Sequence, residues 1–119
     1  NVMIRKPVIG KIVAEAIEEF HGRVSLTNHK GKIIRIKQRN GITDAADYLE
    51  ISCGEKGLDL RIFIAIRFGT SISAVTEQLI HDVKYYVEHY TGIEANSIAV
   101  VVTGLISKQV TRRNIEVKG

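Results

Sequence analysis

Cysteine, proline and aromatic residues are scarce in this chain, and long hydrophobic runs are missing from it. Its single cysteine, Cys53, cannot form an internal disulfide, which excludes a disulfide-stapled scaffold and removes any need for an oxidising compartment. The longest apolar runs, such as residues 62–66, are much shorter than the roughly 20 residues of a membrane-spanning helix. The first residues also lack the apolar stretch of a secretory signal. These absences predict a cytoplasmic protein with no direct membrane span.

The chain does contain enough apolar sequence for one hydrophobic core. Its 119 residues are 45% hydrophobic and 25% charged, which argues against a disordered chain and suits one compact domain. The apolar patterns end at Leu105. We therefore predict a single α+β domain over residues 1–105 and a basic C-terminal tail over residues 106–119.

Two segments have the periodicity of amphipathic helices. The first, at about residues 7–21, begins with Pro7, which suits the first helical turn, and ends at Gly22. The second follows a capping serine, Ser71 or Ser73, and ends at Gly92. The expected inward stripe of the second helix consists of Ile72, Val75, Leu79, Ile80, Val83, Tyr86, Val87 and Tyr90.

Alternation of apolar and polar residues predicts strands at residues 34–37, 49–53 and 58–68, and an apolar run at 98–102 is typical of a central strand. The order is α-β-β-β-α-β. We predict a two-layer α+β fold, with two helices packed on one face of a small mixed sheet. A parallel strand pair in it would use the second helix as its crossover. Cys53 is expected to be buried, and Phe68 to share the core face of its strand.

The sheet face away from the helices is expected to be unusually apolar. It would present Phe63, Ala65, Ala99 and Val101, more apolar surface than a solvated face normally shows. Ordinary scatter of exposed apolar residues explains part of this. A second copy of the chain or another protein would cover the rest. We therefore name Phe63, Ala65 and Val101 as candidate interaction residues and expect a homo-oligomer.

The outer face of the second helix is another candidate contact surface. Gln78, His81, Tyr85 and His89 project away from its core stripe. Tyrosine is enriched at protein interfaces, so this group is a plausible contact patch. A simple surface tyrosine is an equally good interpretation.

Positive charge is segregated along the chain. Residues 1–40 hold nine Lys/Arg against three Glu, residues 41–107 are net acidic, and residues 108–119 are basic again. The basic stripe within residues 23–39 would suit phosphates, anionic lipid or an acidic partner, or would simply keep a strand edge soluble. A nucleic-acid-binding module is therefore the alternative function, although aromatics are only 6% of the chain. The candidate anion-binding residues are Arg23, Lys30, Lys32, Arg35, Lys37 and Arg39.

No catalytic, metal or cofactor site is predicted. His81 and His89 are eight positions apart on one helix, which is roughly 12 Å at about 1.5 Å per residue. That separation is too large for one ion. His21 and His29 have no metal-ligand spacing, and the common nucleotide-binding and serine-nucleophile motifs are missing. We therefore predict a non-enzymatic protein. A small-molecule-binding or enzymatic domain stays open as a second alternative, which a deep pocket with convergent polar side chains would favour.

Several stretches together resemble the alkaline shock protein family, envelope stress response proteins of Gram-positive bacteria. They are the opening helix at residues 7–16, the strand at 58–69 that ends in aromatic-Gly, the segment from Ser71 to the Thr91-Gly92 helix end, and the valine-rich strand at 98–104. They cover about three quarters of the chain. Ser73 stands where the family often has proline, and the basic region at residues 30–40 is no family signature.

The resemblance implies a non-enzymatic stress response or scaffold protein that self-associates. It also implies work near the inner face of the membrane, through a membrane-anchored protein partner. No catalytic residue comes with it.

Overall fold

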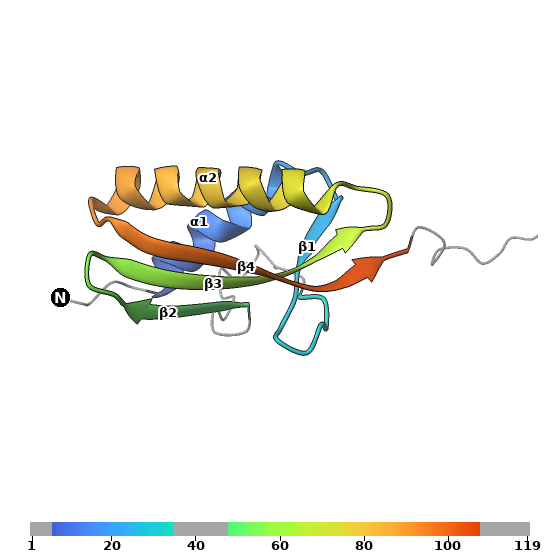
Figure 1. The fold of residues 1–119 in the computed structure, drawn as a ribbon, viewed down its shortest axis with the longest axis horizontal. Helices are drawn as coiled ribbons and strands as arrows, with labels where there is room; N and C mark the ends of the chain where they lie inside the picture. The colour runs from blue at the N-terminus through green and yellow to red at the C-terminus, as the bar shows by residue number, and fades with distance from the viewer. Residues whose placement is uncertain (1–5, 35–47, 108–119) are drawn as a thin grey trace, which may run out of the picture.

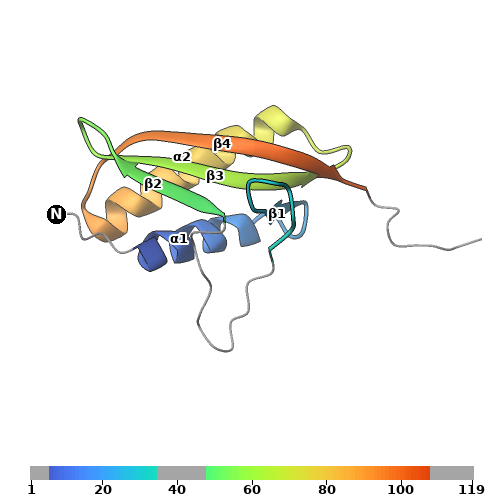
Figure 2. The same ribbon diagram turned by 90° about the horizontal axis from the view of Figure 1, so that it is seen from below.

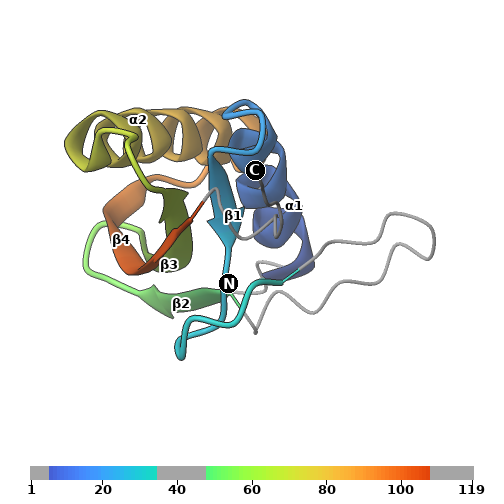
Figure 3. The same cartoon turned by 90° about the vertical axis from the view of Figure 1, so that its right-hand side faces the viewer.

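The computed structural model describes residues 6–34 and 48–107, which form two helices and four strands in the order α-β-β-β-α-β. Both helices lie on the same side of the sheet (Figures 1 and 3). The predicted α+β class and element order are therefore confirmed. The elements are α1 Lys6–Glu18, β1 Val24–Leu26, β2 Leu49–Cys53, β3 Leu58–Arg67, α2 Ile72–Thr91 and β4 Ala95–Ile106.

The long strand β3 is the centre of a mixed sheet. β4 runs parallel to it along its whole length, from the pair Leu58↔Ala95 to the pair Arg67↔Ile106. The other edge of β3 is shared by two shorter antiparallel strands, β2 beside its first half and β1 beside its second half. Helix α2 connects β3 to β4, as a parallel strand pair requires.

The ends of α2 show why the helix occupies these residues. The Oγ atom of Ser71 accepts a hydrogen bond of 3.2 Å from the backbone N–H of Ala74, so Ser71, and not Ser73, is the N-cap. At the other end Gly92 has φ 75°, and its N–H donates to the carbonyl oxygen of Glu88 at 3.0 Å. A left-handed glycine satisfies the last carbonyls of a helix without the steric cost of a Cβ.

The core lies between the two helices and the sheet. Tyr48 is 2% exposed, and its hydroxyl donates to the carbonyl oxygen of Gly10 at 3.1 Å, which ties the residue before β2 to α1. The predicted stripe of α2 is confirmed at its centre, whereas Ile72 and Tyr90 at its two ends are exposed. The residues with no exposed surface include Ile9, Val13, Leu49, Ile62, Ile64, Ile66, Leu79, Val83 and Val87.

Three expectations about the strands are wrong. The first strand is β1 at Val24–Leu26, and Ile34 is not in a strand; the rest of the segment predicted there, residues 35–37, lies outside the described residues. Phe68 is 71% exposed because β3 ends one residue earlier, at Arg67, so the alternation no longer places its side chain under the helices. Cys53 is exposed because it is the last residue of β2, at the open end of the sheet.

The sheet face away from the helices is less open than expected. Phe63 is only 6% exposed and Ala65 only 4%. The segment after β1 turns back across this face (Figure 2), and Gly31 lies so close to Thr103 of β4 that an added Cβ would be 3.5 Å from its carbonyl oxygen. Phe63 and Ala65 are therefore covered within one chain, which the strand pattern alone cannot show.

Candidate interaction sites

Four aromatic rings in the second half of α2 form one continuous surface. Tyr85 stacks on His89 with ring centroids 5.6 Å apart, and Tyr86 stacks on Tyr90 with centroids 5.9 Å apart. Edge-to-face contacts of 5.3 Å and 5.1 Å join the two stacks. The spacing of four residues places each pair one above the other on the helix. We call Tyr85, Tyr86, His89 and Tyr90 the α2 aromatic surface.

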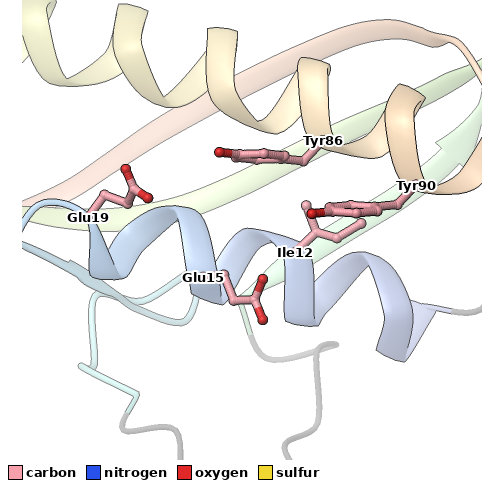
Figure 4. A pocket seen from close by; sticks show the side chains of 5 residues that line it. All are labelled: Ile12, Glu15, Glu19, Tyr86 and Tyr90. Atoms are coloured by element: carbon pink, nitrogen blue, oxygen red, sulfur yellow. The ribbon is translucent and has the colours of Figure 1, made fainter.

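A groove next to this surface separates α2 from α1. Figure 4 shows the rings of Tyr86 and Tyr90 on one side, and Ile12 and Glu15 of α1 with Glu19, the residue that follows α1, on the other. The groove has a volume of about 120 Å³. Small-molecule sites usually have about 300–1,000 Å³, so this groove suits the end of a single side chain better than a substrate.

The charge in this groove is negative. The carboxylate of Glu19 raises the pKa of the Tyr86 phenol above its ordinary value, and partial burial acts in the same direction. Tyr86 therefore stays a neutral hydroxyl that can donate a hydrogen bond. Aromatic faces and carboxylates both attract cations. The groove is thus chemically suited to an arginine or lysine side chain.

The residues that the sequence predicts on the outer face of α2 are all exposed. Tyr85 and His89 lie together in the α2 aromatic surface, with Tyr85 55% exposed. Gln78 is two turns earlier, and its Nε2 donates to Oδ1 of Asp82 at 2.9 Å. His81 lies between them along the helix and is also exposed. The four predicted residues therefore lie on one face of α2. Among them, ring contacts are made by Tyr85 and His89, in the second half of the helix.

Sequence reasoning missed three functional candidates in this region. Tyr86 and Tyr90 were assigned to the core stripe, yet Tyr90 is 63% exposed. Glu19 was not singled out at all. One signal was available, because two overlapping i,i+4 aromatic pairs on a helix are too bulky for one buried stripe, and a tyrosine hydroxyl favours contact with water.

Only half of the predicted basic stripe can be placed. Arg35, Lys37 and Arg39 lie outside the described residues. Arg23, Lys30 and Lys32 are exposed, and Nε of Arg23 donates to the carbonyl oxygen of Phe20 at 3.2 Å. The backbone N–H groups of Lys30 and Lys32 both donate to the Oδ1 atom of a turn residue, Asn28.

Of the predicted apolar interaction residues, only Val101 retains partial exposure, while Ala99, two residues before it, is exposed. Both lie on β4. Within residues 6–34 and 48–107 no three His, Cys, Asp or Glu side chains are grouped as metal ligands. Neither helix of the described part is long and apolar enough to cross a membrane.

The chain was compared with protein families, with curated proteins and with solved structures. The model of the alkaline shock protein 23 family, described as having a cell envelope-related function, matches residues 1–107. No curated protein matches the chain, and no solved structure matches it. The family match spans both helices, all four strands and the α2 aromatic surface. The chain therefore belongs to the alkaline shock protein family, and its function is related to the cell envelope.

Proposed function

We propose that this chain is a non-enzymatic assembly module of the cell envelope, which self-associates and binds protein partners at the inner face of the membrane. The family supplies the envelope-related role. The α2 aromatic surface supports self-association and partner binding. Tyr85 and Tyr90 are more than half exposed, although the rings of both contact Tyr86. Exposed tyrosine clusters are typical of protein interfaces.

The partner that this surface fits is a protein segment with a basic side chain. The rings of Tyr86 and Tyr90 would contact its aliphatic part, and the carboxylates of Glu15 and Glu19 would pair with its cation. A membrane-anchored partner of this kind would hold the chain at the envelope, although no helix of the described residues spans a membrane.

The test is affinity capture from the source cells, with and without detergent solubilisation of the membrane. The bait is the wild-type chain or the double variant Tyr85→Ala/Tyr90→Ala. We expect the wild-type chain to retain a detergent-solubilised protein that the double variant loses. The matched control is Phe68→Ala, which removes an aromatic ring that is 71% exposed but lies outside the α2 aromatic surface.

Two results would count against this function. Equal capture by the wild-type chain and the double variant would exclude the α2 aromatic surface as the partner site. Recovery of only ribosomal or nucleic-acid-binding proteins, with salt-dependent retention on heparin, would favour the alternative nucleic-acid-binding function of residues 23–39.

A further inference from the structure

The outer edge of β4 is open. β4 has 12 residues and, within residues 6–34 and 48–107, pairs with β3 only, since β1 and β2 both lie on the other edge of β3. Figure 2 shows β4 at the margin of the sheet. In an edge strand, the backbone N–H and C=O groups of alternate residues point away from the sheet. Across the described part of the chain, the outer edge of β4 therefore presents a long row of backbone donors and acceptors that no neighbouring strand pairs with.

This edge lacks the features that usually keep a strand edge from pairing. Natural edge strands are short, or carry charged residues or proline. Residues 95–106 contain no charged residue and no proline. The other edge strands differ, because β1 has only three residues and β2 carries the exposed Glu50. The protective features of β4 are two register shifts against its partner β3, one between Leu58 and Asp59 near the start of β4 and one between Ile64 and Ala65 nearer its C-terminal end.

The side chains of this edge are apolar on both faces. Val100 and Val102 are half-buried and pack against the core, while Ala99 is exposed and Val101 half-exposed on the opposite face. Leu105 is 56% exposed. A strand added here would cover apolar surface above and below the sheet as well as the backbone groups.

We propose that β4 pairs with β4 of a second copy of this chain, antiparallel about a two-fold axis, so that two four-stranded sheets become one. This proposal rests on the proposed function, which includes self-association, and it places the self-association interface at the outer edge of β4. A second copy is the occupant because β4 offers no charge that would select a charged partner, and two identical uncharged strands do not repel each other. A two-fold axis presents the same strand from both copies, which pairs them antiparallel.

The length of β4 is sufficient for a specific interface. Twelve residues at about 3.3 Å each give an edge of roughly 40 Å. Antiparallel pairing forms about one hydrogen bond per residue of each strand, and typical protein interfaces contain roughly 10 direct hydrogen bonds. Because the two register shifts lie near the two ends of β4, we place the two-fold axis near Val100, in the regular part of the strand between Ser97 and Val102.

The first test compares the self-association of three variants by sedimentation velocity over a wide concentration range. Ala99→Lys places like charges next to each other across the two-fold axis, and we expect it to raise the dissociation constant at least about tenfold. The matched control is Ser52→Lys, which adds the same charge to an exposed position of β2. Tyr85→Ala reports on the α2 aromatic surface. Thermal unfolding of each variant shows that it is folded.

The second test uses the wild-type chain alone, so it does not depend on the folding of any variant. Amide hydrogen exchange is measured at low and high protein concentration. Alternate residues of β4 already donate to β3, so we expect the remaining amides between Ala95 and Val102 to gain protection at high concentration. No such gain is expected in β2.

The outcomes separate the failure of this interface from the failure of self-association. Loss of association in Ala99→Lys but not in Ser52→Lys, with concentration-dependent protection of β4, supports the pairing. Unchanged association in Ala99→Lys overturns the β4 interface but leaves self-association intact, and loss in Tyr85→Ala would then assign it to the α2 aromatic surface. A wild-type chain that stays monomeric at the highest concentration overturns both the pairing and the self-association.

Discussion

The most informative perturbation of the fold is removal of the hydroxyl of Thr27. This buried residue, with 0% exposure, follows β1, and its Oγ1 atom lies 2.9 Å from the carbonyl oxygen of Asn28 and 2.7 Å from Oγ1 of Thr103. The Thr103 hydroxyl also lies 3.1 Å from the carbonyl oxygen of Ile64. These contacts hold the segment after β1 against β4, across the covered face of the sheet.

The expected cost follows from these bonds. Thr27→Val keeps the side-chain shape, removes one buried hydroxyl and leaves Thr103 with Ile64 as acceptor, so we expect a loss of about 1–2 kcal/mol in the free energy of unfolding. Thr103→Val should cost about the same. Because the two hydroxyls share a bond, the double variant should lose less than the sum of the single losses, by about 1 kcal/mol.

Chemical denaturation of the four proteins measures this double-mutant cycle. The control is Thr76→Val on α2, whose hydroxyl bonds only to the local carbonyl oxygen of Ser73 at 3.2 Å and whose loss should change stability by less than about 0.5 kcal/mol. Strict additivity of Thr27→Val and Thr103→Val, within about 0.3 kcal/mol, would refute the contact between the β1 segment and β4.

Three further predictions concern other parts of the fold. Gly57→Ala should lower the free energy of unfolding by about 1–3 kcal/mol in a denaturant titration, because its Cβ would overlap the carbonyl oxygen of Glu94. Ser71→Ala should cost about 1 kcal/mol in the same assay, since α2 loses its cap. The N–H of Ala95 lowers the pKa of the Glu88 carboxyl below its ordinary value. The contribution of Glu88 to the free energy of unfolding is therefore complete above pH 4.5 and is lost as the pH falls through the lower folded pKa. In an acid titration, Glu88→Gln should show a shallower loss of stability than the wild-type chain.

Each of these predictions has a matched control. A Cβ at Gly104 would meet no atom within 4 Å, so Gly104→Ala should leave stability within about 0.5 kcal/mol. Ser73→Ala tests a serine that does not cap α2, and Glu77→Gln tests an exposed carboxylate of the same helix. A loss in any control as large as in its partner variant would contradict the structural reason given for that partner.

The helices and the long strand were predictable because their signals are local. Pro7, Ser71 and Gly92 act within one helical turn, and the alternation of β3 reports which residues face the helices. The confirmed stripe of α2, from Val75 to Val87, follows from the same periodicity. These features depend on residues that are close together in the chain, so they can be predicted from the sequence alone.

The positions of β1, Phe68 and Cys53 were not predictable in this way. β1 has only three residues, too few for a periodic signal, and it exists because β3 offers a free edge to Val24–Leu26. Phe68 and Cys53 continue the apolar alternation of their strands but lie where the sheet ends. A pattern shows which way a side chain points and does not show whether anything covers it.

The candidate sites divide in the same manner. The sequence alone determined the α+β class, the segregation of charge, the family and the exposed face of α2 with Tyr85 and His89, because each is encoded in composition or local spacing. Only the tertiary structure decided that Phe63 and Ala65 are covered and that β4 is the open edge. Burial and edge position depend on which distant segments pack together, and that is a property of the folded chain as a whole.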